Sequence, residues 1–386
     1  MQSQNLANFF IWVTVVWLLI MLINRLFSLT GRYGILVGPF YLMWRTTRIN
    51  RLFDNIASRK KRAWLVFFDI GIALGIGQMV FAYYWLIKNL FAFLSRAEEA
   101  VPVYPVIPGL TIGVESLKYF IPAILIIFIT HEFAHGIAVR LMGVNIKSVG
   151  ILAVFVLLGA FVEPNEEELD KLKVKPKLRI FSAGSMANLI TAMLFITLIG
   201  ILFFQTPSGV MVRSTLEGYP AHGQIPPYSV IIRLDNRSIA SIKDLAEYMD
   251  RTKPYTTVVV EFIDPQGEIR NVILKLAPNP SRPNRGFLGV EITDYIPSRM
   301  HLPPKLTIEI FSAFSWIQML CISVAVLNML PIYPFDGGKI IFTLIDSYVK
   351  GEWSKKLLKV LFVGSAVILL VSNTALTLMK YPILPI

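Results

Sequence analysis

Long stretches with few or no charged side chains recur along this chain of 386 residues and constrain its fold more than any other feature. A helix that crosses a membrane needs about 20 apolar residues. Six stretches are long enough: Leu6–Ile23, Trp64–Ile87, Tyr119–Leu141, Ile180–Phe204, Ile310–Leu330 and Val360–Met379. The sequence therefore predicts a polytopic α-helical membrane protein with six transmembrane helices.

The composition agrees with a membrane protein and disfavours a soluble one. Apolar residues make up 55% of the chain and charged residues 16%, whereas about 25% is usual for soluble domains. The net charge of +12 would suggest nucleic acid in a soluble protein. Here the basic residues lie between apolar stretches, so we expect the lipid bilayer, and no nucleic acid, as their partner. The single cysteine, Cys321, lies in an apolar stretch; it excludes a disulfide framework, and we expect it to be structural.

The Lys and Arg residues indicate how the helices are oriented, because cytoplasmic connections are enriched in them. They gather in the connections 24–63 and 142–179 and before the last stretch, and only three occur in 88–118. We expect an integral protein of the cell membrane with both termini outside. The first stretch is expected to be an anchor because no Lys or Arg precedes it. The segment Ile35–Trp44 is too short to cross and is expected to dip into the membrane or lie at its surface.

One region interrupts the apolar pattern. Residues 206–300 are charged, rich in proline and free of long apolar runs. Thr256–Ile263 has strand character, and Ser241 with Asp244 is typical of a capped helix start. We expect a small extracytoplasmic α+β domain inserted between helices four and five. The predicted regions are N-terminal helices and a basic cytoplasmic loop in 1–117, the two parts of a membrane core in 118–205 and 301–386, and this insert.

The third apolar stretch contains the most specific motif, His131-Glu132-Phe133-Ala134-His135. Positions i and i+4 share one face of a helix, so both imidazoles can reach one zinc ion. Glu132 can then take a proton from zinc-bound water. Ionisable groups at membrane depth are costly unless they are paired or bound to metal. The motif therefore favours a metal site inside the membrane.

Two histidines leave a zinc ion short of a protein ligand. Asp336 follows an uncharged stretch in Asn328-Met-Leu-Pro-Ile-Tyr-Pro-Phe-Asp336-Gly-Gly, where the prolines break the helix and the glycines permit unusual backbone angles. Its carboxylate could point into a polar cavity, or it could cap the next helix; with the histidine motif present, the ligand role is favoured. Asp69 is the rival ligand, although its surroundings contain no break or motif.

These motifs resemble the site-2 protease family of intramembrane metalloproteases. The resemblance covers Tyr119 to Tyr348 and implies one zinc ion per chain, bound by His131, His135 and Asp336, with Glu132 as general base and acid. Because the histidines lie in the second half of an inward-running helix, the site should be nearer the cytoplasmic face.

The family also carries Gly-x-x-x-Asn, matched here by Gly184-Ser-Met-Ala-Asn188, although Ser185 stands where proline is common. Asn188 and Asn328 are then candidates for hydrogen bonds to the substrate backbone or the oxyanion; otherwise they hold helices together. The family further implies a re-entrant β-hairpin over Gly150–Glu163 that offers an edge to an extended substrate.

The inserted domain is similar to a PDZ domain. Gly286-Phe-Leu-Gly-Val290 resembles a strand and loop that accept the carboxyl end of a peptide. The domain could equally exclude substrates with bulky ectodomains. The remaining histidines, His222 and His301, are expected to be surface residues without a role in the site.

Together these features predict an intramembrane zinc metalloprotease that hydrolyses peptide bonds in transmembrane segments of membrane-anchored substrates, as in regulated intramembrane proteolysis. A membrane metal transporter would use the same ligands without needing Glu132 as a base. An inactive PDZ-bearing membrane scaffold would need no complete ligand set.

Overall fold

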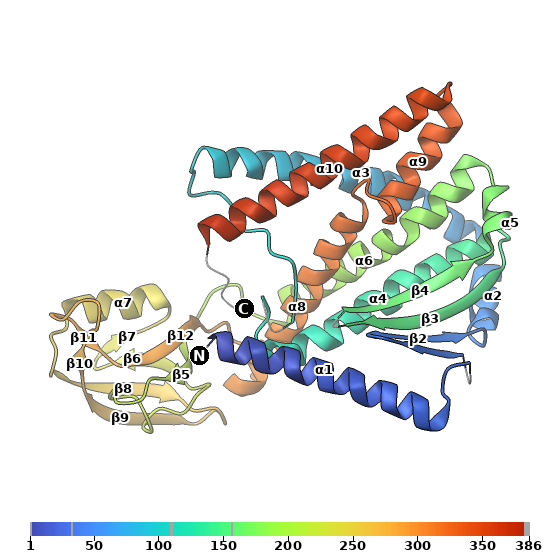
Figure 1. Ribbon diagram of the computed structural model, residues 1–386. Coiled ribbons are helices and arrows are strands. Elements are labelled where there is room, and N and C mark those ends of the chain that lie inside the picture. Colours follow the sequence, from blue (N-terminus) through green and yellow to red (C-terminus); the bar gives the residue numbers. More distant parts are fainter. Residues whose placement is uncertain (1, 32–33, 109–110, 156, 382–386) are drawn as a thin grey trace. The chain divides into compact units, whose positions relative to one another are not determined.

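The computed structural model describes residues 2–31, 34–108, 111–155 and 157–381. These residues form two compact units, Met1–Met193 with Trp316–Ile386, and Leu194–Ser315. Within the described residues, six helices are long and apolar enough to cross a membrane: α1 (Gln2–Phe27), α3 (Lys61–Leu94), α4 (Leu117–Leu141), α6 (Val174–Leu202), α8 (Pro304–Asn328) and α10 (Glu352–Lys380) (Figure 1). Each overlaps one predicted stretch, so the prediction of six such helices is confirmed.

These helices present large apolar side chains on their outer faces. On α3, for example, Val80, Phe81 and Tyr84 are each more than half exposed. An exposed apolar surface of this extent is costly in water and favourable in lipid. The helices therefore indicate an integral membrane protein, and their buried faces pack the first unit together.

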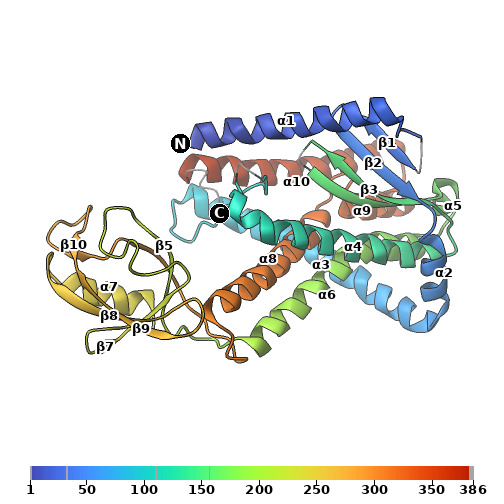
Figure 2. The same ribbon diagram turned by 90° about the horizontal axis from the view of Figure 1, so that it is seen from below.

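The first unit also contains a four-stranded antiparallel sheet in the order β1-β2-β3-β4. Its strands are β1 (Ile35–Gly38), β2 (Tyr41–Thr46), β3 (Ile146–Val154) and β4 (Leu157–Pro164). Strands β3 and β4 form the hairpin expected over Gly150–Glu163, except that Val156 lies outside the described residues. Helix α4 packs beside β4, and α1 contacts β1 (Figure 2).

The segment Ile35–Trp44, expected to dip into the membrane or lie at its surface, has regular secondary structure that was not predicted. It forms β1 and most of β2. Strand β2 pairs along its length with β3, so that Trp44 lies opposite Ile151. This pairing satisfies main-chain N–H and C=O groups that would otherwise be costly to bury in an apolar environment.

Short helices connect these elements. They are α2 (Asn50–Ser58), α5 (Glu166–Asp170) and α9 (Asp336–Tyr348). On α2, Phe53 is buried with Ala134 and Ile137 of α4 and Ala183 of α6. This cluster fixes α4 and α6 against each other at the level of the histidine motif.

The second unit is built around a six-stranded sheet in the order β12-β5-β6-β8-β9, with β7 paired to β6. Its elements are β5 (Val210–Thr215), β6 (Val230–Leu234), β7 (Arg237–Ser238), α7 (Ile242–Arg251), β8 (Thr257–Ile263), β9 (Ile269–Lys275), β10 (Ala277–Pro278), β11 (Gly286–Phe287) and β12 (Val290–Asp294). Ile231, Leu234, Val258 and Val260 lie in its core. Ser241 and Asp244 form the expected capping box at the start of α7, so an α+β unit is present.

Candidate metal centre

Three side chains from distant parts of the chain meet inside the first unit. His131 and His135 lie one turn apart on α4, and their Nε2 atoms are 3.1 Å apart. Asp336, the first residue of α9, brings its Oδ2 to 3.1 Å from Nε2 of His135 and 3.4 Å from Nε2 of His131. All three side chains are largely buried. Three potential ligand atoms therefore face one point.

The break before α9 explains how a carboxylate reaches this point. Helix α8 ends at Asn328, and α9 begins eight residues later at Asp336. A Cβ atom on Gly337 would lie 2.1 Å from the carbonyl oxygen of Met329, and one on Gly338 would lie 2.7 Å from Ile332. Only glycine lets the first turn of α9 pack this closely on the chain before it. Asp336 does not cap α9: the N-cap residue is Phe335, and no side chain makes a capping hydrogen bond there.

The spacing of the three atoms fits a tetrahedral metal ion. Zinc binds His nitrogen and carboxylate oxygen at about 2.0–2.2 Å, which puts neighbouring ligands of a tetrahedron about 3.3 Å apart. The observed separations are 3.1, 3.1 and 3.4 Å. Two imidazoles and one carboxylate with a fourth position open are also a ligand set typical of catalytic zinc. The donor chemistry and the geometry of this site therefore suit zinc.

The imidazole rings of His131 and His135 are each held by a contact to Nδ1, on the side away from the metal position. Nδ1 of His135 lies 2.8 Å from the carbonyl oxygen of Ile180 and can only donate to it, which leaves Nε2 free for a metal. Nδ1 of His131 lies 3.2 Å from Nδ2 of Asn188. Between these contacts, α6 presents Gly184, where an added Cβ would lie 2.4 Å from atoms of both rings.

Glu132 lies beside the ligand group and near the sheet. It is half-buried, and its carboxylate lies close to the backbone of Val162 on β4. The carboxylate is thus held where the last strand of the sheet passes α4. No strand among the described residues pairs with the outer edge of β4.

The other candidates from the sequence fall in different places. Asn328 points its Nδ2 to 3.4 Å from Nε2 of His131, on the side where a metal would lie. Asp69, the rival ligand, is instead paired with Arg179 at 2.7 Å and with Lys175 at 3.1 Å. It therefore ties α3 to α6.

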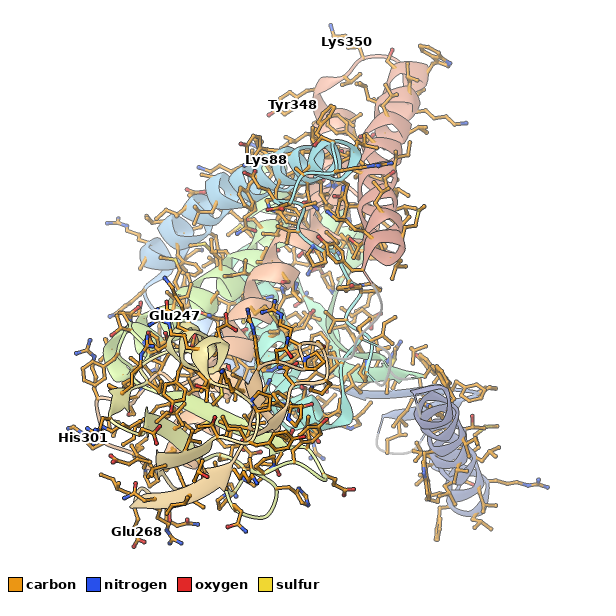
Figure 3. All side chains as sticks on the ribbon, turned by 90° about the vertical axis from the view of Figure 1, so that its left-hand side faces the viewer. Lys88, Glu247, Glu268, His301, Tyr348 and Lys350 are labelled. Atoms are coloured by element: carbon orange, nitrogen blue, oxygen red, sulfur yellow. The ribbon has the colours of Figure 1, made fainter. Side chains whose placement is uncertain are left out.

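Cys321 is buried in α8 and is not among the clustered ligands. His222 and His301 also lie outside the cluster; His222 contacts Thr215, and His301 is exposed (Figure 3).

Sequence reasoning missed three contacts of the centre: the carbonyl of Ile180, the hydroxyl of Thr130 next to Asn188, and the backbone of Val162. A backbone group that contacts a site residue cannot be predicted from a pattern of side chains in the sequence. Thr130 precedes the motif directly, but threonine in an apolar helix usually bonds to its own backbone.

Comparison with known proteins adds relatives of three kinds. The chain is 30% identical over 238 residues to an uncharacterized protein of Methanocaldococcus jannaschii, covering 61% of this chain and 56% of that one. It is 21% identical over 222 residues to a membrane-bound transcription factor site-2 protease homolog of Arabidopsis thaliana, covering 54% and 42%. It is 24% identical over 310 residues to a protein of Fusobacterium nucleatum named as a zinc metalloprotease, covering 65% and 90%. The chain thus spans about half the length of the first two relatives.

Solved structures resemble only a part of the chain. A PDZ domain of an SdrC-like protein from Listeria innocua matches 22% of this chain and 92% of its own length, with 22% identity and a TM-score of 0.20. A solution structure from Geobacillus thermodenitrificans matches 23% of this chain and all of its own, with 28% identity and a TM-score of 0.20.

The family comparison is more extensive and covers the whole candidate centre. Residues 119–372 match peptidase family M50, a stretch that includes the histidine motif, Gly184, Asn188 and Asp336. The match extends over more than half of the chain. This chain therefore belongs to peptidase family M50.

Proposed function

We propose that this protein is an intramembrane zinc endopeptidase that cleaves transmembrane segments of membrane-anchored substrates, as in regulated intramembrane proteolysis. The observation that carries the proposal is the convergence of His131, His135 and Asp336 among helices apolar enough to cross a membrane, with Glu132 beside them. A buried cluster of this kind is costly in lipid unless a metal compensates it.

The chemistry follows from the position of each side chain. A zinc ion bound by the three ligands would polarise the scissile carbonyl and make water more acidic. Glu132 accepts the proton of the attacking water and delivers it to the leaving amide nitrogen. Asn328, on the metal side of His131, can donate a hydrogen bond to the carbonyl oxygen as negative charge develops there.

The sheet and an apolar cavity support a peptide substrate. The outer edge of β4 could pair with an extended strand and bring it to Glu132, which already meets β4 at Val162. A cavity of about 570 Å³ is lined by Phe120 and Ile124 of α4, Leu158 of β4 and Leu327 of α8, among others. Ile124 lies two turns, or about 10 Å, before His131 on α4, so apolar residues flanking a scissile bond could occupy this cavity.

The remaining parts of the proposal concern the insert and the membrane. In this proposal the chain consists of N-terminal helices with a basic loop (1–117), a catalytic membrane core in two parts (118–205 and 301–386) and the insert (206–300). The sheet of the insert runs from Val210 to Asp294, and α8 begins at Pro304. The insert would act as a PDZ-like domain outside the cell membrane, where it binds peptide carboxyl ends or excludes bulky substrates. Both termini would lie outside, with the metal centre nearer the cytoplasmic face.

The direct test separates metal binding from catalysis. The full chain is reconstituted in liposomes with a fluorescent single-span peptide, and zinc content and cleavage are measured on the same samples. Glu132→Gln should keep its zinc and lose cleavage by about 10²–10⁴-fold, the range that a general base contributes. Glu166→Gln, an exposed glutamate on α5, serves as the matched control and should cleave normally.

Two results would count against the proposal. Cleavage by Glu132→Gln at the wild-type rate would show that this residue is not the base. Zinc flux across the liposome membrane without any peptide cleavage by the wild type would favour a transporter that uses the same ligands.

A further inference from the structure

Asn188 contacts the metal centre from the side opposite the metal position. Its side chain is completely buried on α6. Its Nδ2 lies 3.2 Å from Nδ1 of His131, and its Oδ1 lies 3.1 Å from the hydroxyl of Thr130. Both polar atoms of the amide are therefore engaged within the protein, and neither is available to a peptide.

The spacing of Gly184 and Asn188 explains why both residues are needed. Four residues apart on α6, they lie on one face of the helix. Gly184 lets the helix backbone approach both imidazole rings, since an added Cβ would lie 2.4 Å from each. One turn later, that close approach brings the amide of Asn188 into hydrogen-bonding distance of His131.

The chemistry of a metal-bound imidazole fixes the direction of the hydrogen bonds. A histidine that binds metal through Nε2 carries its proton on Nδ1, which must then donate to an acceptor. A half-turn of the planar amide exchanges Nδ2 and Oδ1 at nearly the same positions. Nδ1–H of His131 then donates to Oδ1 of Asn188, and Nδ2–H of Asn188 donates to the Thr130 hydroxyl. That hydroxyl can donate in turn to the carbonyl oxygen of Ile126, 2.9 Å away.

We propose that Asn188 is a positioning residue that orients His131 for metal binding, and that it contacts neither the substrate nor the oxyanion. It does for His131 what the carbonyl of Ile180 does for His135. Asn328, which faces Nε2 of the same ring, keeps the role toward the substrate. The inference rests on the proposed metal centre, but it concerns metal affinity and not cleavage.

The test measures zinc affinity of the purified full chain by competition with a chromophoric chelator. Asn188→Leu removes the acceptor at similar volume and should weaken zinc binding about 10–100-fold, the usual effect of losing such a partner. Asn188→Asp keeps an oxygen acceptor and should restore most of the affinity. With cobalt in place of zinc, the absorption bands of Asn188→Leu should shift, whereas those of Asn188→Asp should stay close to wild type.

Two control variants define the specificity of the effect. Ser185→Ala alters a buried side chain on the same helix whose hydroxyl has no partner among the described residues, and it should leave zinc affinity unchanged. Asn328→Leu should also leave zinc affinity unchanged while lowering cleavage. Should Asn188→Leu fail to fold, Thr130→Val removes the next acceptor and should weaken zinc binding in the same direction.

Three results would overturn the inference. If Asn188→Leu bound zinc with wild-type affinity but had a raised KM for peptide cleavage, Asn188 would be a substrate-binding residue. Equal losses of zinc affinity in Asn188→Leu and Asn188→Asp would show that Asn188 acts only through packing. An unchanged zinc affinity in Thr130→Val would show that the Thr130 hydroxyl does not take part in orienting His131. A wild-type chain that binds no zinc would instead contradict the metal centre itself, so the two failures are distinguishable.

Discussion

Gly184 lies where the backbone of α6 comes closest to the two imidazole rings. A methyl group at this position would lie 2.4 Å from Nε2 of His135 and 2.5 Å from Nε2 of His131, far inside van der Waals contact. The ring nitrogens that face the metal position would be the first to move. Because metal affinity depends on ligands held to a few tenths of an ångström, the absence of one side chain here is a requirement of the site.

Gly184→Ala should therefore lose zinc affinity by at least about tenfold, the lower end of what disturbing the orientation of a ligand costs. The same change elsewhere in a helix is favourable by up to about 1 kcal/mol. Gly200→Ala, on the same helix with no atom within 4 Å of the new methyl, is the control and should keep its zinc and its thermal stability. Zinc titration of both variants measures this difference in affinity. Normal zinc binding by Gly184→Ala would show that α6 can move away from the imidazole rings without a loss of affinity.

Residue patterns predicted more about ligands than about the groups behind them. The i, i+4 spacing of His131 and His135 and the helix break before Asp336 pointed to three side chains that the structure brings together. Asn188 was expected at the substrate or between helices, and it lies against His131. Which ring nitrogen an amide faces depends on the angle and distance between α4 and α6, which no local pattern contains.

Hydropathy located the six long helices found among the described residues, but each helix begins before the apolar stretch that predicted it. Helix α3 runs from Lys61 to Leu94, whereas the apolar stretch, which carries only Asp69, suggested Trp64–Ile87. Polar residues such as Lys88 and Asn89 continue the helix because its last turns pack on other elements; Asn89, for example, donates to Asn373 of α10 at 2.9 Å. Hydropathy measures the apolar core of such a helix and not its hydrogen-bonded length.

The β1–β2 hairpin was missed because its stability comes from a distant partner. Strand β2 pairs with β3, about 100 residues later in the chain, and the ten-residue apolar segment alone does not distinguish a strand from an interfacial loop. One signal was available in Gly150. A Cβ there would lie 2.0 Å from the carbonyl oxygen of Trp44, and a glycine inside a strand often marks such a close backbone approach.

At the scale of the whole molecule, the proposed orientation in the membrane can be tested with the single cysteine removed. In a Cys321→Ala background, new cysteines at Glu268 and Lys350 would stand on exposed positions (Figure 3). The orientation predicts that Glu268→Cys reacts with an impermeant maleimide in intact cells, because the insert lies outside. Lys350→Cys, in the basic connection between α9 and α10, should react only after permeabilisation. The opposite labelling pattern would invert the proposed topology.

One metal ion, bound by His131, His135 and Asp336, would join α4 to α9 in this protein. The most direct measurement is the zinc content per chain of purified wild type, Asp336→Ala and Asp69→Asn, with affinity determined on the same samples. We expect one zinc per wild-type chain, loss of tight binding in Asp336→Ala, and retention in Asp69→Asn, because the carboxylate of Asp69 is paired with Arg179. Tight binding of one zinc by Asp336→Ala, or its loss in Asp69→Asn alone, would show that Asp336 is not the third ligand.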